Sequence, residues 1–142
     1  MDGELVFKVS YIAFFKNTRV ITIIITYVFA GMGVFFLDPI LPLRINSLGG
    51  SDNTIALFFA LISLSFVIGS IVSGVIAAKN NKMLIVLLFV FLQAVGLVAL
   101  SGIIVPGSIL LVMTAFSVSL VGFAEGCLTV PVISIILDTM ER

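Results

Sequence analysis

The sequence predicts an all-α, polytopic membrane protein, a bundle of four transmembrane helices. Hydrophobic residues make up 61% of the 142 residues and charged residues only 10%, against roughly 25% charged residues in soluble domains. The mean hydropathy is +1.39. A helix needs about 20 apolar residues to cross a bilayer core roughly 30 Å thick, and the uncharged stretches provide four such segments. We expect no separate aqueous domain.

The first helix is expected over residues 20–43, beginning after Arg19. The second is expected over residues 53–78, behind a hydrated turn at residues 50–53 that includes a candidate N-cap. Residues 83–124 are all uncharged and long enough for two helices. Pro106-Gly107 divides them, because this dipeptide favours a turn. The third and fourth helices are therefore expected over residues 83–104 and 108–137.

Residues 1–18 are expected to form an N-terminal segment before the transmembrane domain of residues 19–142. They contain Asp2 and Glu4 with only a short apolar run, which is not typical of a cleaved signal peptide. Their apolar cluster at residues 9–15 fits either a short surface helix or a frayed tether. Six of the seven basic residues fall on one side of the predicted spans, and only Arg44 on the other. This bias predicts that both termini lie on the cytoplasmic side of an unspecified membrane.

Glu125 is the only charged residue between Met83 and Leu137. A charged side chain near the bilayer centre costs about 2.5–3.5 kcal/mol on insertion scales, and such residues usually face a bundle interior or a water-filled cavity. This favours Glu125 as a proton- or substrate-binding residue. The alternative is a protonated glutamate that forms a hydrogen bond inside the bundle for packing alone.

The fourth predicted helix carries small residues on the face that Glu125 borders. Their spacings of four, three, four and three place them in one stripe: Ala115, Ser119, Gly122, Gly126 and Thr129. Pro131 follows and is expected to kink the helix. Gly122 and Gly126 are therefore candidates for a cavity or a packing face. In the second helix, Gly69 with Ser73 and Ser70 with Gly74 predict a packing face.

Other polar residues are weaker candidates than Glu125 for functional sites. Asp38 lies near the outer end of the first helix and is a candidate for substrate or proton coupling, with simple solvation at the interface as the equal alternative. It could pair with Arg44 across the mouth of a cavity. Gln93 is expected to form an interhelical hydrogen bond worth about 1 kcal/mol. Tyr27 is expected to pack inside the helix bundle, and a role in binding a ligand is the second interpretation.

The residue inventory excludes several chemistries. The chain has no histidine and a single cysteine, Cys127, so it cannot build a His/Cys metal site, an intrachain disulfide or a Ser/His/Asp triad. We expect no cofactor, no metal and no enzymatic activity. The net charge is zero, which gives no reason to expect a nucleic-acid partner.

Two segments resemble major facilitator superfamily transporters. Residues 37–42 (LDPILP) resemble the end of the first helix of a repeat in that family, and residues 122–126 (GFAEG), with Pro131 after them, are similar to its fourth helix. The approach at residues 14–19 looks like the lead-in to a C-terminal half. Within the family, the vesicular amine and polyamine transporter-like branch is the most similar in character.

Residues 69–82 (GSIVSGVIAAKNNK) resemble the short loop that follows the second helix in the same family. Gly74, Lys79 and Lys82 match the pattern and are gating-loop candidates by this resemblance. The acidic position of the pattern is Ala78 here, and its loop glycine is Asn81. These departures put in doubt the charge relay that the intact loop implies.

The resemblance implies a partial half of a larger fold, since a complete transporter has two six-helix halves built from three-helix repeats. Further helices would come from the rest of the transporter, a second copy or other subunits, all within the lipid bilayer. The first functional hypothesis is a secondary carrier segment that moves a small solute, such as an organic cation, by alternating access. The alternatives are a transporter-derived scaffold subunit of a larger membrane complex and a small four-helix homodimeric carrier.

Overall fold

The computed structural model describes residues 17–101 and 109–140, and within them the chain is helical without any strand. The helices are α2 (Thr18–Phe35), α3 (Leu37–Ser47), α4 (Asp52–Ala77), α5 (Lys82–Leu100) and α6 (Leu110–Met140). In this part of the chain, four helical spans are long and apolar enough to cross a membrane, α2 and α3 together forming the first. The predicted all-α bundle of four spans is confirmed. The expected surface helix near residues 9–15 and the turn at Pro106-Gly107 lie outside the described residues.

The first span runs to Ser47 and contains a local irregularity at Phe36, between α2 and α3. Phe36 keeps helical backbone angles, and its N–H still bonds to the Met32 carbonyl oxygen at 3.0 Å, so the span is otherwise continuous. Pro39 explains the position of this irregularity. A proline ring clashes with the carbonyl group four residues earlier, here that of Phe35, and it has no N–H to donate. Helix α2 therefore ends at Phe35, and Pro39 lies in the first turn of α3, where the missing N–H is harmless.

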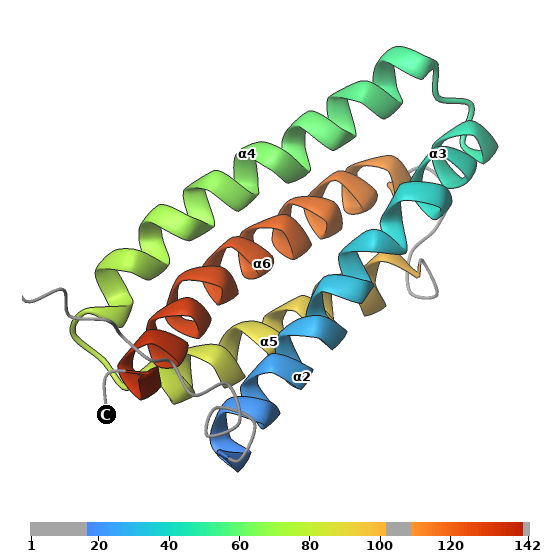
Figure 1. Ribbon diagram of the computed structural model, residues 1–142. Helices are drawn as coiled ribbons and strands as arrows, with labels where there is room; N and C mark the ends of the chain where they lie inside the picture. Colours follow the sequence, from blue (N-terminus) through green and yellow to red (C-terminus); the bar gives the residue numbers. More distant parts are fainter. Residues whose placement is uncertain (1–16, 102–108, 141–142) are drawn as a thin grey trace, which may run out of the picture.

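Helix α6 forms the centre of the bundle. Figure 1 shows α4 along one side of it, with α2 and α5 along the other. In the membrane-spanning window of α6, 56% of residues are buried, against 33% for α5, 17% for the first span and 11% for α4. Contacts of α6 are extensive with α4 and α5 and much sparser with α2. The α2 helix is therefore the most loosely attached of the spanning helices.

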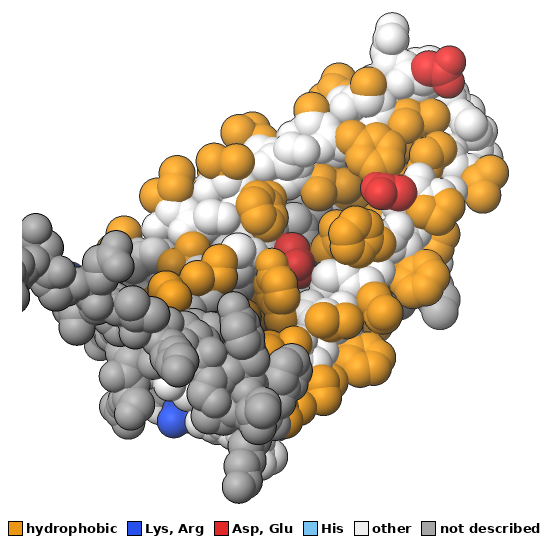
Figure 2. Space-filling model, in the orientation of Figure 1, with side chains coloured by type: hydrophobic (Ala, Val, Ile, Leu, Met, Phe, Trp, Pro, Cys, Tyr) orange, Lys and Arg blue, Asp and Glu red, His pale blue; other side chains and the backbone are white. Residues whose placement is uncertain are grey.

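The outer faces of the helices are apolar. Large hydrophobic side chains such as Phe29, Leu43 and Phe91 are about 70% exposed, at 69%, 71% and 68%. Figure 2 shows these apolar side chains spread over the visible face, with few charged groups among them. Such a surface suits lipid tails rather than water. The chain is therefore built as an integral, multi-pass membrane protein.

Glycines bring α4 and α6 into direct backbone contact. A Cβ atom on Gly126 would collide with the carbonyl group of Phe66, and one on Gly122 with the carbonyl group of Ile62. From the other side, a Cβ atom on Gly69 would collide with the carbonyl group of Phe123. This is the close approach that small residues permit in membranes. Gly122 and Gly126 thus line an interface between helices.

The predicted packing face of the second helix is confirmed for one of its two pairs. Gly69 and Ser73 are buried, and the Cys127 thiol lies 3.2 Å from the Gly69 carbonyl oxygen. A Cβ atom on Gly74 would meet no other atom within 4 Å, so this glycine packs against nothing in the described part of the chain. The packing face of α4 is therefore narrower than the face that the spacing of its small residues predicted.

Candidate functional site

Glu125 lies in the interior of the bundle, and only 8% of its surface is exposed. Its position on α6 turns it away from α4 and towards α2 and α5. Gln93 on α5 donates a hydrogen bond from Nε2 to Glu125 Oε2 at 3.2 Å. The charge-bearing residue is thus held by an amide rather than by a cation. Among the described residues, the only ion pair is the one between Lys82 and Asp138.

The side-chain amide of Gln93 connects three helices. Its Nε2 also donates to the backbone carbonyl oxygen of Ala30 on α2, at 2.8 Å. The interhelical hydrogen bond predicted for Gln93 is confirmed, and it is made twice. Gln93 is 3% exposed, and its Oε1 has no hydrogen-bond partner within the described part of the chain. The two Nε2 bonds are therefore the interactions that orient this amide.

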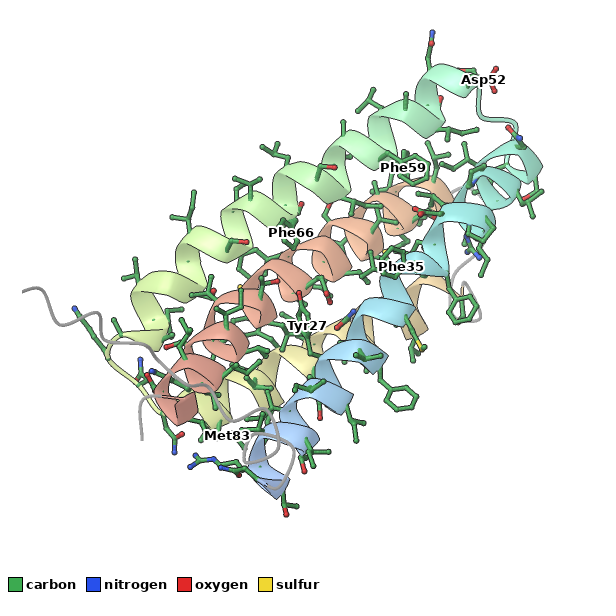
Figure 3. All side chains as sticks on the ribbon, viewed as in Figure 1. Tyr27, Phe35, Asp52, Phe59, Phe66 and Met83 are labelled. Carbon is green, nitrogen blue, oxygen red and sulfur yellow. The ribbon has the colours of Figure 1, made fainter. Side chains whose placement is uncertain are left out.

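Tyr27 and Gly31 bring α2 to the same place. The Tyr27 hydroxyl lies 3.3 Å from Thr129 Oγ1, which itself donates to the Glu125 backbone carbonyl oxygen at 3.0 Å. Gly31 stands beside the carboxyl group, since a Cβ atom built on it would lie 3.8 Å from Glu125 Oε1. Figure 3 shows Tyr27 between α2 and α6 at mid-height of the bundle. A short polar network therefore surrounds Glu125.

A hollow of about 540 Å³ opens between α2 and α6 beside this network. Its lining is apolar and aromatic apart from one carboxyl group: Tyr27, Val28, Gly31, Met32, Phe35 and Glu125. In Figure 2, acidic side-chain atoms are visible in a hollow between apolar groups. Ligand pockets have volumes of about 300–1,000 Å³ and combine apolar walls with a few polar groups. The hollow has the size and composition of a site for a small solute.

A second hollow, of about 360 Å³, lies on the other side of α2, between α2 and α5. It is lined by Gln93 and by apolar residues of both helices, among them Phe29, Ala30 and Leu97. Helix α2 thus separates two hollows, and the hydrogen-bonded pair of Gln93 and Glu125 lies beneath it. This arrangement explains why α2 has few packing contacts.

Asp38 and Arg44 do not pair with each other. Asp38 is exposed, whereas Arg44 directs Nη1 to the Ser101 carbonyl oxygen and Nε to Thr114 Oγ1, both at 3.4 Å. Arg44 therefore connects the end of the first span to the far ends of α5 and α6. Asp38 is not brought near Glu125 by any described contact.

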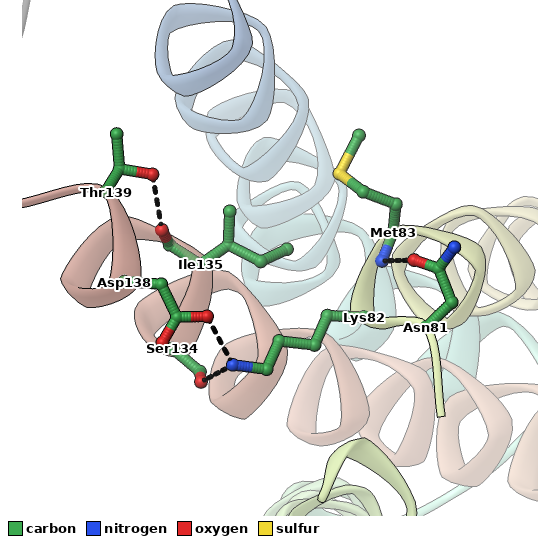
Figure 4. Close-up of polar contacts among 7 residues, drawn as sticks. All are labelled: Asn81, Lys82, Met83, Ser134, Ile135, Asp138 and Thr139. Carbon is green, nitrogen blue, oxygen red and sulfur yellow. Dashed lines mark hydrogen bonds and ion pairs between the residues drawn. The ribbon is translucent and has the colours of Figure 1, made fainter. Parts of the chain in front are cut away.

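The opposite end of the bundle is polar. Lys82 donates to Ser134 Oγ at 2.7 Å and forms an ion pair with Asp138 on α6 (Figure 4). Asn81, at the position where the family loop has a glycine, caps α5 by accepting a hydrogen bond from the Met83 N–H at 3.1 Å. This cap gives a local reason for the departure from the family pattern, because asparagine is a strong N-cap.

The three gating-loop candidates thus have different surroundings in the structure. Lys82 ties α5 to α6, Lys79 is exposed, and Gly74 lies on an open face of α4. The partner of Lys82 was not singled out from the sequence. Asp138 could have been found, because the end of the fourth span and the start of the third must lie on the same side of the membrane.

The family model of the Major Facilitator Superfamily matches residues 4–142, nearly the whole chain. The chain belongs to the major facilitator superfamily. Its members are membrane transporters and not enzymes, so the match supports membrane transport by a carrier of this superfamily. The comparison with curated proteins found no match, and the comparison with solved structures found none either.

Several residues of this superfamily chain that contact the site were not selected from its sequence. Met32 and Phe35 line the hollow, and both look like ordinary lipid-facing residues in the sequence. The Ala30 carbonyl group is a backbone acceptor that no sequence pattern reports. Periodicity along α2 could have found Met32 and Phe35, since they share a helical face with Val28 and Gly31.

Proposed function

We propose that this chain forms part of the solute pathway of a major facilitator carrier, and that Glu125 binds a proton or a small organic cation there. One observation carries the proposal: a buried carboxyl group lines a hollow whose other walls are apolar and aromatic. Residues of this kind inside membranes usually mark ion or substrate pathways.

The character of the lining supports an organic cation as the solute. Tyr27 and Phe35 lie in the same hollow as Glu125, and aromatic faces attract cations with about 0.5–2 kcal/mol. A carboxylate supplies the opposite charge, and Met32 adds an adaptable apolar surface. We propose, from the resemblance of the sequence alone, that the chain belongs to the vesicular amine branch, whose solutes are of this class, and to a C-terminal half. The excess of Lys and Arg on one side of the spans supports a cytoplasmic location of both termini.

Alternating access fits the difference in packing around α6. The α2 helix has sparse contacts with α6, whereas α4 and α5 pack closely against α6. We propose that α2 moves relative to the other three helices when the hollow opens. Additional helices, from the same transporter or a second copy, would complete the pathway.

The test is uptake of tetraethylammonium by the protein purified from its native membrane and reconstituted into liposomes with an imposed proton gradient. Glu125→Gln should abolish gradient-driven uptake, because an amide can neither carry a proton nor neutralise a cation. Asp52→Asn removes an exposed carboxyl group at the start of α4 and should leave uptake unchanged. Wild-type uptake by Glu125→Gln would remove Glu125 from the pathway.

The native mass in mild detergent should be measured first. A larger polypeptide or a matching second copy supports the carrier proposal. A 15.2 kDa chain held in a complex of unrelated subunits, whose activity is indifferent to Glu125→Gln, would support the scaffold alternative instead.

A further inference from the structure

The two oxygens of the Glu125 carboxyl group have different surroundings. Oε2 accepts a hydrogen bond from Gln93 Nε2 at 3.2 Å. Oε1 is the oxygen beside Gly31, which lines the same hollow between α2 and α6 as Glu125 itself. One oxygen is therefore tied to α5, and the other faces the hollow.

The Gln93 amide cannot be reversed in this position. The Ala30 carbonyl oxygen lies 2.8 Å from Gln93 Nε2 and can only accept a hydrogen bond, so the NH₂ group must face it. The reversed amide would place Oε1 against two oxygen acceptors, those of Ala30 and Glu125. The α2 backbone thus fixes which group Gln93 presents to the carboxyl group.

We infer that Gln93 is a positioning residue that makes Glu125 Oε2 a permanent acceptor and leaves Oε1 as the atom that takes up the proton or cation. A protonated carboxyl group has one oxygen that donates and one that accepts. Because Oε2 faces an N–H group in both states, the proton resides on Oε1. This inference rests on the proposed function of Glu125 and adds which atom exchanges and which residue selects it.

Few ionisable groups surround the carboxyl group in the described part of the chain. Tyr27 of α2 lines the same hollow, and Cys127 of α6 faces α4 through the Gly69 carbonyl oxygen. Helix α5 presents only the uncharged Gln93 at this level. The ion pair of Lys82 and Asp138 lies at one end of the bundle, and Arg44 is engaged at the other. Proton exchange at Oε1 is therefore not balanced by a neighbouring cation.

Infrared spectroscopy of the full chain in lipid vesicles tests the role of Gln93. The carbonyl stretching band of protonated Glu125 is identified by its loss in Glu125→Gln, and its proton should exchange in D₂O. In Gln93→Leu the band should move to higher frequency, because Oε2 no longer accepts a hydrogen bond. Gln93→Met keeps the side-chain length without the donor and should give the same shift if the leucine variant fails to fold.

Carbodiimide labelling tests the exposure of Oε1. An apolar carbodiimide takes the carboxyl proton onto nitrogen while the carboxyl oxygen bonds to its central carbon, so it reports a protonated oxygen that faces the hollow. Gly31→Ala places a methyl group 3.8 Å from Oε1 and should slow labelling of Glu125, because the methyl group narrows the approach to that oxygen. Gly74→Ala, on an open face of α4, is the matched control.

Three results would each overturn the inference. They are an unchanged carbonyl band in both Gln93 variants, equal labelling rates in Gly31→Ala and Gly74→Ala, and a Glu125 proton that never exchanges with solvent. Neither readout depends on solute uptake. Loss of the proposed transport function would therefore be seen in the tetraethylammonium assay alone, and failure of the Gln93 role in these spectra alone.

Discussion

The α4–α6 interface and the α2–α6 interface differ in what fills them. Between α4 and α6, glycines let the backbones touch, and Gly126 and Gly69 have no space for even one added methyl group. Between α2 and α6 lie a hollow of about 540 Å³, a tyrosine and a carboxyl group. In lipid, helices associate by close packing and by hydrogen bonds, and here each interface uses mainly one of the two. The first is suited to rigidity and the second to movement.

The largest effect is expected from filling the α4–α6 interface. Gly126→Val would push the backbone of Phe66 away and should lower the free energy of unfolding by about 1–3 kcal/mol or more. The measurement is denaturant-induced unfolding in mild detergent, with Gly74→Val as control, because within the described residues a Cβ atom on Gly74 would meet no atom of another helix within 4 Å. Equal destabilisation by both variants would contradict the assignment of the rigid interface.

The ion pair of Lys82 and Asp138 should contribute less. The two side chains are 30% and 55% exposed, and such pairs are typically worth about 0.2–1 kcal/mol. A double-mutant cycle with Lys82→Met and Asp138→Asn should give a coupling energy in this range that falls as salt is added. A coupling that is independent of salt would argue against the geometry shown in Figure 4.

Tyr27→Phe tests the α2–α6 interface. It removes the hydroxyl group that lies 3.3 Å from Thr129 Oγ1 and keeps the ring. Interhelical hydrogen bonds in membranes average about 0.6 kcal/mol, so the unfolding free energy should fall by this amount. A loss as large as that of Gly126→Val would mean that α2 is held as firmly as α4.

Gly31→Ala should have the smallest effect on stability. Its added methyl group would lie 3.8 Å from Glu125 Oε1, an ordinary van der Waals distance, whereas the same change at Gly126 meets a carbonyl group. The unfolding free energy should change by less than about 0.5 kcal/mol. Gly126→Ala, measured alongside, should be clearly less stable, and the reverse order would refute the comparison of the two interfaces.

Much of the fold could be predicted because bilayer thickness and hydropathy limit the choices. The uncharged runs located all four spans, and glycine spacing identified Gly69 as a packing residue. The irregularity at Phe36 was harder to place, because the steric effect of Pro39 acts on the residue four positions before the proline itself. Lys82 and Arg44 lie at opposite ends of the bundle, and the cytoplasmic side of the termini stays a prediction from the excess of Lys and Arg.

The candidate site was predicted only in part. Glu125 and Gln93 stood out as rare polar residues in apolar helices, and they lie within hydrogen-bond distance. That they meet depends on the relative rotation of α5 and α6, which close packing at Gly96 against Val121 helps to set. Such rotations arise from the whole interface and leave no local pattern. The pairing considered for Asp38 and Arg44 did not form because both residues lie on α3, and a separation of six residues places them on different faces of that helix.

A tilt of α2 about the irregularity at Phe36 would move each residue of α2 in proportion to its distance from Phe36. Arg44 holds α3 to the ends of α5 and α6, while the 18 residues of α2 extend about 27 Å. A tilt of about 5° would move the far end of α2 by about 2 Å and Ala30, six residues from Phe36, by less than 1 Å. Even that smaller displacement would stretch the 2.8 Å bond from Gln93 towards its limit. The hydrogen bond from Gln93 to Ala30 would therefore weaken at a tilt that moves the far end of α2 by only about 2 Å.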